Sequence, residues 1–276
     1  MKITFSLFFS FPFFCFLLFL LPVRGIAQPG DEMKTDNKPA HPGQFSFGAD
    51  LVSRYVWRGT DYGNSPAIQP NVSFSIAGFK IGAWGSYGFV PYSRKINDSI
   101  TKTMGNFVES DLNISYTFKG FTLMVTDYFF PNPLCPNEDN RYFNYDNKTT
   151  GHTFEANLTY AGPESFPIQV FAGMHIYGAD KGKDSTGVCG AGNKNNYSSY
   201  LEASYQFNVK GVGVKPFIGG IPYESLWYGR SAGIVNLGLT VSKTIKITKD
   251  YSLPLYTSII TNPETQSVFF VFGITL

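Results

Sequence analysis

Charged side chains that could bind or steer ions stand at alternate positions in several otherwise apolar segments of the chain. Asp50, Arg54 and Arg58 share one parity in the first of these segments, and Glu109 and Asp111 share one parity in a later segment. In an extended strand, residues two apart lie on the same face, so each group would present its charges to one side. Carboxylate and guanidinium groups opposed in this way can pair, or can form a charged constriction that selects ions.

Two interpretations of these charged faces stay open. Arg54 and Arg58 could pair with the acidic residues and fill a narrow interior, because buried charges need partners. They could instead line a water-filled constriction whose charges set solute and ion preference. The candidate interior residues are Asp50, Arg54, Arg58, Gln69, Asn71, Glu109, Asp111, Glu155 and Glu202.

Twelve segments in which apolar and polar residues alternate must position these side chains. Between residues 67 and 77, Ile68 and Val72 fall on one face, while Gln69 and Asn71 fall on the other. A strand that meets lipid on one side and water on the other needs this two-residue rhythm. We predict strands at about 44–58, 67–77, 79–90, 107–118, 121–130, 152–161, 167–178, 198–209, 212–221, 231–246, 251–260 and 266–276.

The connections between the predicted strands alternate in length. Turns such as Ala77-Gly78, Lys119-Gly120 and Lys210-Gly211 are short, whereas most of the intervening connections are long. The pattern predicts an all-β fold, a transmembrane antiparallel up-and-down β-barrel of about twelve strands, with short periplasmic turns and longer extracellular loops. A soluble lipocalin-like barrel or a secreted β-sandwich would share the alternation. Long strands with an aromatic-rich apolar face fit a bilayer core of about 25 Å better.

The N-terminal region predicts export. Residues 1–27 carry Lys2, an apolar stretch and a small residue, Ala27, at the expected cleavage point, as in a secretory signal peptide. An uncleaved membrane anchor is the alternative, because the apolar stretch approaches the length of a spanning helix. Residues 28–43 are rich in proline and charge and predict a disordered periplasmic tail, so the barrel takes up residues 44–276. The expected location is the bacterial outer membrane.

Charge and composition narrow the range of partners. Without Lys2 and Arg24 the chain has 22 − 2 = 20 basic and 20 acidic side chains, so no basic surplus indicates nucleic acid. Aromatic residues make up 17% of the chain, which favours a membrane protein with interfacial aromatic girdles. We expect contact with outer-membrane lipid, a small hydrophilic solute and the outer-membrane assembly machinery, and we expect no cofactor.

Two cysteines remain after the predicted signal peptide, which contains Cys15. Cys135 and Cys189 both fall in long polar loops. In an oxidising compartment they could form a disulfide, or they could be two unpaired loop thiols. A metal site is not expected, because no CxxC motif or nearby histidine accompanies them.

Short motifs in the first part of the predicted barrel resemble a known family. They are Tyr55-Val56-Trp57-Arg58-Gly59, Pro66-Ala67-Ile68-Gln69 and Gly82-Ala83-Trp84-Gly85-Ser86. Together with the acidic segment around Glu109 and Asp111, they resemble the TorF-type porins, a bacterial family of poorly characterised function. The similarity covers about residues 47–118. It implies an outer-membrane barrel with a porin role, and it indicates location more than substrate.

A catalytic role is the weaker alternative. His152 opens a predicted strand on the apolar face near the external rim, with Ser198 or Ser199 across a loop, but no GxSxG motif or adjacent acid supports a hydrolase. His175 has inward parity and is expected to be a hydrogen-bond partner in the interior. We therefore expect a porin-like channel for small hydrophilic solutes or ions, and no enzyme. A non-conducting structural, ligand-binding or adhesion barrel is the alternative.

Overall fold

The computed structural model describes residues 43–276 except 92, 98–99, 104, 132–140 and 184–189. Every regular element in the described residues is a β-strand. No helix in this part of the chain is long and apolar enough to cross a membrane. The predicted signal peptide (1–27), the predicted tail up to residue 42, and both Cys135 and Cys189 lie outside the described residues.

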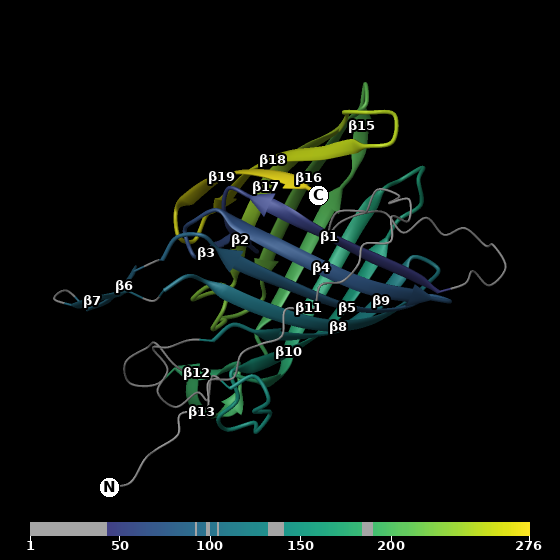
Figure 1. The fold of residues 1–276 in the computed structure, drawn as a ribbon. Coiled ribbons are helices and arrows are strands. Elements are labelled where there is room, and N and C mark those ends of the chain that lie inside the picture. The colour runs from purple at the N-terminus through teal and green to yellow at the C-terminus, as the bar shows by residue number, and fades with distance from the viewer. Residues whose placement is uncertain (1–42, 92, 98–99, 104, 132–140, 184–189) are drawn as a thin grey trace, which may run out of the picture.

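Twelve strand positions close into one antiparallel barrel, which confirms the predicted all-β, up-and-down barrel of about twelve strands (Figure 1). The eighth position is interrupted at Gln206, so it consists of β14 followed by β15. The ring closes where β1 pairs with β19 and β14 pairs with β16. In chain order the wall strands are β1 (Gln44–Val52), β4 (Ala67–Ile76), β5 (Phe79–Gly88), β8 (Val108–Phe118), β9 (Phe121–Phe129), β10 (His152–Ala161), β11 (Ile168–Gly178), β14 (Ser199–Tyr205) with β15 (Phe207–Val209), β16 (Val212–Ile221), β17 (Gly233–Lys246), β18 (Ser252–Asn262) and β19 (Ser267–Thr275).

Alternation along each strand separates an apolar outer face from a polar interior. On β1, Phe45 and Phe47 are 72% and 61% exposed, whereas Asp50 is buried. On β8, Leu112 and Ile114 are exposed, and residues that alternate with them, such as Asp111 and Ser115, are buried. Because side chains alternate across a strand, the register that exposes the apolar residues also buries the charged ones.

The two ends of the barrel differ in their connections. At one end the turns are short, and three of them place two residues with positive φ between adjacent strands: Ala77-Gly78, Lys119-Gly120 and Lys210-Gly211. Such turns match the twist of paired strands. The opposite end, called the rim here, carries six longer connections, at 53–66, 89–107, 130–151, 179–198, 222–232 and 263–266.

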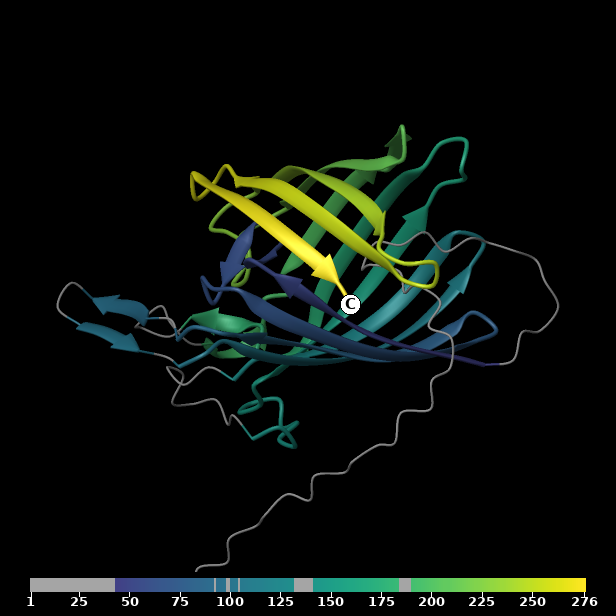
Figure 2. The ribbon, with the colours of Figure 1, turned by 45° about the horizontal axis from the view of Figure 1, so that its top comes forward.

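Three of the rim connections contain small strand pairs of their own. Figure 2 shows β6 (Ser93–Asn97) and β7 (Ile100–Thr103) as an arm that projects from the rim. A second pair consists of β12 (Lys181–Lys183) and β13 (Gly190–Asn195). The third pair, β2 (Tyr55–Trp57) and β3 (Thr60–Tyr62), lies between β1 and β4 and folds into the interior.

The predicted first strand, 44–58, was therefore too long. The wall strand β1 ends at Val52, and residues 53–66 leave the wall to form the β2–β3 hairpin. Arg54 and Arg58 belong to this hairpin and not to the wall. Tyr55 and Trp57, which parity along an unbroken strand would place on the apolar outer face, instead contact interior residues such as Trp84 and Tyr128.

Candidate functional site

The β2–β3 hairpin is short and is closed by a turn that its sequence favours. Tyr55 pairs with Tyr62, and Trp57 pairs with Thr60. Between them, Arg58 and Gly59 have φ values of 50° and 79°, the left-handed pair that a tight two-residue hairpin requires. Arg58 and Gly59 therefore form the tip of the hairpin.

The base of the hairpin is held by an ion pair. The Arg54 guanidinium lies 2.7 Å from Asp61 Oδ2, and the side chain of Arg54 is about one-third exposed. Burial raises the pKa of the Asp61 carboxyl, while the charge of Arg54 opposes this rise. Exposure and screening limit what such a pair contributes to stability. It serves to join the two arms of the hairpin.

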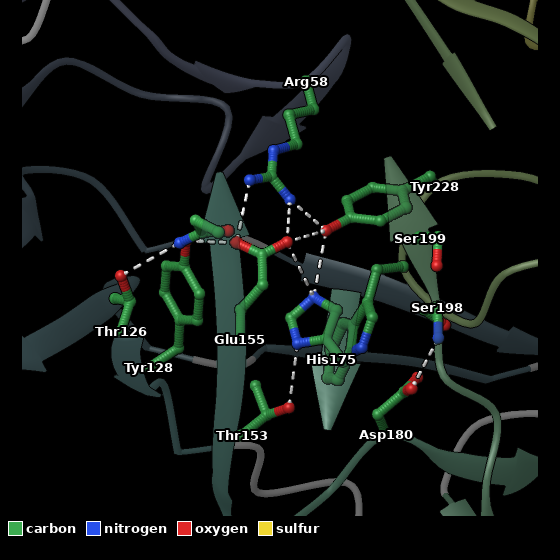
Figure 3. Close-up of polar contacts among 12 residues, drawn as sticks. Arg58, Thr126, Tyr128, Thr153, Glu155, His175, Asp180, Ser198, Ser199 and Tyr228 are labelled. Atoms are coloured by element: carbon green, nitrogen blue, oxygen red, sulfur yellow. Dashed lines mark hydrogen bonds and ion pairs between the residues drawn. The ribbon is translucent and has the colours of Figure 1, made fainter. Parts of the chain in front are cut away.

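At the tip, Arg58 reaches Glu155 on β10 (Figure 3). Its Nη1 donates to Glu155 Oε1 at 2.5 Å and its Nη2 donates to Oε2 at 2.9 Å. Nη1 also donates to the hydroxyl of Tyr228, in the 222–232 connection. The Glu155 side chain is fully buried, and that of Arg58 is 9% exposed. A two-bond pair shielded from water is among the strong polar interactions in proteins.

Further hydrogen bonds fix the Glu155 carboxylate. Tyr128 donates to Oε2 at 3.0 Å and Tyr228 donates to Oε1 at 3.3 Å. His175 on β11 lies between Thr153 and Tyr228, with Nδ1 3.0 Å from the Thr153 hydroxyl and Nε2 2.9 Å from the Tyr228 hydroxyl (Figure 3). We refer to Arg58, Glu155, His175 and Tyr228 together as the lumen clamp.

Aromatic rings surround the guanidinium of the lumen clamp. The Arg58 Cζ atom lies 4.5 Å from the Trp57 ring centroid and 4.7 Å from that of Tyr200. It lies 4.8 Å from the Phe171 centroid and 5.3 Å from the Tyr228 centroid. Cations are attracted to aromatic faces at such distances, and more so when water is excluded. The rings therefore stabilise the charge of Arg58 inside the barrel.

The hairpin crosses the barrel interior. It leaves the wall between β1 and β4, and β10 is the fifth strand from β1 in a ring of twelve. Its tip also approaches β17, because a Cβ atom on Gly59 would collide with the Val235 carbonyl oxygen. From β18, Asn262 donates to the Gly59 carbonyl at 3.1 Å. One rim connection thus joins nearly opposite parts of the wall.

A second rim connection supplies Tyr228 to the lumen clamp. Asp180 is fully buried and accepts from the amide and the hydroxyl of Ser198, at 2.8 Å and 2.6 Å (Figure 3). The same hydroxyl accepts from the Leu226 amide at 3.2 Å, which holds the 222–232 connection over the barrel. Burial raises the pKa of Asp180, and the hydrogen bonds from Ser198 oppose this rise.

The family to which the chain belongs follows from its sequence. Residues 36–224 match a family described as a bacterial protein of unknown function, Gcw_chp. The chain belongs to the Gcw_chp family. The Gcw_chp region contains the hairpin, Glu155 and His175, whereas Tyr228 lies beyond its last matched residue. No curated protein matches the chain.

Of the two arginines predicted to lie in the interior of this Gcw_chp chain, the structure joins only one to a predicted acidic partner. Arg58 pairs with Glu155, while Arg54 pairs with Asp61 on its own hairpin. Glu109 and Asp111 on β8 are buried, at 5% and 7% exposure, and neither Arg54 nor Arg58 forms an ion pair with them.

The other predicted residues lie elsewhere on the wall strands. Asp50 accepts from Thr275 at 2.6 Å, and Gln69 donates to Ser86 at 3.4 Å. Glu202 accepts from Tyr200 at 2.5 Å and from Asn236 at 3.1 Å. Asn71 on β4 is half-buried. These residues are distributed around the ring and do not form one cluster.

His152 forms a separate polar pair away from the lumen clamp. It is fully buried, with Nδ1 2.8 Å from Asp127 Oδ1 and Nε2 2.5 Å from the Tyr142 carbonyl oxygen. Asp127 has the same parity as the exposed residues Leu123 and Val125 of β9, so the pair lies on the outer face of the wall. The rings of Tyr142 and Tyr145 cover it. His152 is thus a partner for the 130–151 connection and not an exposed interfacial residue.

Sequence reasoning missed the aromatic members of the site. Tyr128 and Tyr228 gave no local signal, because their partners are distant in the chain. The hairpin did leave a signal: Trp57-Arg58-Gly59-Thr60 has the same residue-then-glycine turn as Phe118-Lys119-Gly120-Phe121. Both turns have positive φ at the two central residues.

Proposed function

We propose that this protein is a bacterial outer-membrane channel for small hydrophilic solutes or ions, closed in this conformation by the β2–β3 hairpin. Passage is passive and involves no chemistry. The lumen clamp is the part that holds the hairpin across the interior.

The distribution of apolar side chains supports membrane insertion. Phe270 and Val268 on β19 are 70% and 67% exposed, and the exposed apolar residues continue around the barrel. A water-soluble protein rarely exposes so extensive an apolar surface. The predicted signal peptide and the resemblance of residues 47–118 to the TorF-type porins support the same location and role.

The observation that carries the proposal is the Arg58–Glu155 pair. Side chains of the wall strands would be enough to fill the core of a barrel. Here the β2–β3 hairpin enters the interior instead, and Arg58 at its tip binds Glu155 on β10. Nearer the short turns, the interior side chains are mostly small and polar, such as Ser73 on β4, Ser115 on β8 and Thr240 on β17. Release of the tip would connect this polar interior to the rim.

Planar bilayer recordings test the proposal. We expect wild-type protein to show rare openings, and Arg58→Ala to raise the open probability about tenfold or more, since it removes a buried charge-assisted pair. Arg54→Ala is the matched control, because it removes an arginine of the same hairpin that does not reach the far wall. Absence of conductance in folded wild-type and Arg58→Ala protein would contradict the channel.

Such a result would favour a non-conducting barrel that binds a partner at the rim. Exposed aromatic side chains in the rim connections support this second candidate function. Phe143 is 87% exposed, Tyr197 51% and Tyr223 43%. Aromatic side chains are enriched in protein interfaces. Loss of cell-surface or ligand binding in Phe143→Ala, with conductance absent throughout, would support it.

A further inference from the structure

Two buried carboxylates on β8 lie outside the lumen clamp. Glu109 and Asp111 are two residues apart on one strand, so they share the inward face. Their exposures are 5% and 7%. Two like charges held this close in the interior of a protein require a compensating charge or a shared proton.

The two arginines of the β2–β3 hairpin could neutralise these carboxylates, but both already form ion pairs with other acidic residues. Arg54 pairs with Asp61, and Arg58 pairs with Glu155. Neither arginine of the hairpin therefore pairs with Glu109 or Asp111. A shared proton or a cation from outside the chain must therefore supply the compensation at this place.

One oxygen of the pair lacks a partner. Asp111 Oδ1 is buried and has no hydrogen-bond partner among the described residues. Tyr55, from the hairpin, lies beside Glu109, and the backbone amide of Phe129 lies beside Asp111. A buried carboxylate oxygen without a donor is uncommon, because native structures satisfy nearly all such groups. Asp111 Oδ1 thus marks a place for a donor that the described chain does not supply.

Aromatic side chains border the same carboxylates. Trp84 on β5 and Tyr128 on β9 are the cross-strand neighbours of Asp111. The Tyr55 ring packs against Trp84 with centroids 5.5 Å apart. Side chains that face each other across a strand pair have Cβ atoms about 5 Å apart. Carboxylates and aromatic faces together are the groups that recognise organic ammonium ions.

The donor set favours an organic cation over a metal ion. No group of three or more His, Cys, Asp or Glu residues suited to a metal occurs in the residues described. Divalent metals usually take more protein ligands than two carboxylates, whereas an ammonium group needs one or two carboxylates and an apolar surround. We propose that Glu109 and Asp111 bind the ammonium group of a small organic cation within the barrel. This inference rests on the proposed channel function, since it names the solute class that the channel would carry.

Calorimetric titration of the full-length folded protein with methylammonium chloride, whose N–H groups can donate to Asp111, tests the site. Sodium chloride at equal ionic strength is the reference, and Arg58→Ala is titrated alongside wild type so that hairpin closure does not hide the site. We expect saturable binding to at least one of these two proteins. Asp111→Asn and Glu109→Gln are made in whichever of the two proteins binds the cation. Each should weaken the binding affinity about tenfold or more, because each removes a charged partner.

Asp50→Asn is the matched control, since Asp50 is also a buried inward carboxylate but is hydrogen-bonded to Thr275. It should bind as its parent protein does. No saturable binding to wild type or Arg58→Ala would overturn the inference, as would equal binding by Asp111→Asn or tighter binding of calcium. Binding without conductance would contradict the channel and leave the ammonium site standing.

Discussion

Arg58 and Glu155 form a two-bond ion pair that links a rim hairpin to the far wall of the barrel. The two residues are 97 positions apart in the chain, and the guanidinium nitrogens lie 2.5 Å and 2.9 Å from the carboxylate oxygens. The pair is buried and surrounded by aromatic rings. Because each charge would be costly to bury alone, loss of either partner should release the hairpin as well as weaken the fold.

Replacement of the Glu155 carboxylate should show how much it costs to bury the Arg58 charge without its partner. Glu155→Gln keeps the side-chain shape but leaves Arg58 buried without its counterion, so we expect the free energy of unfolding to fall by about 3–5 kcal/mol. Urea unfolding of folded protein in detergent, followed by tryptophan fluorescence, measures it. Glu202→Gln is the control, because Glu202 accepts from Tyr200 and Asn236 and not from an arginine in the structure. Equal losses in the two variants would contradict the special role of the pair.

The hairpin tip should tolerate no side chain at Gly59. Gly59 and Gly211 both have φ of 79°, so alanine at either position carries the same backbone strain. A Cβ at Gly59 would collide with the Val235 carbonyl, whereas nothing lies within 4 Å at Gly211. We expect Gly59→Ala to raise channel opening and to expose Trp57 to acrylamide quenching, and Gly211→Ala to do neither. If both variants behave alike, strain in the turn and not contact with the wall governs the hairpin.

Membrane insertion predicts a difference between adjacent residues of β1. Phe47 is 61% exposed on the outer face, and Ser46 is its inward neighbour. Arginine on a lipid-facing position near the bilayer centre costs about 2–4 kcal/mol. We therefore expect Phe47→Arg to reduce folding into lipid vesicles, and Ser46→Arg to affect it little. Folding yield can be read from heat-modifiable gel mobility. A soluble barrel would tolerate Phe47→Arg at least as well as Ser46→Arg.

His152 should hold a rim connection in place and should not catalyse. Its ring contacts Asp127 and the Tyr142 carbonyl. We expect His152→Ala to accelerate trypsin cleavage after Arg141 or Lys148 several-fold, because the segment loses its buried contact. Peptide mass spectrometry identifies the cut. Tyr142→Phe retains the backbone carbonyl and should be cleaved more nearly at the wild-type rate. Lipid hydrolysis that disappears in His152→Ala would contradict a purely structural role.

Alternation along the chain was sufficient to predict the wall of the barrel. The twelve strands were located within a few residues at most ends, because each wall strand separates an apolar from a polar environment at every second residue. The same parity indicated that Glu109, Asp111 and Glu155 share the polar face of their strands. Turns such as Lys119-Gly120 were recognisable because a glycine readily adopts positive φ.

Tertiary structure alone decided what fills the interior. Residues 53–58 continue the alternation of β1, so the alternation does not show that the backbone leaves the wall after Val52. Arg58 finds Glu155 and Tyr228 only when the barrel closes and brings distant strands together. The physical reason is that alternation reports the environment on the two sides of a strand, whereas an ion pair across the lumen depends on the relative positions of strands far apart in the chain.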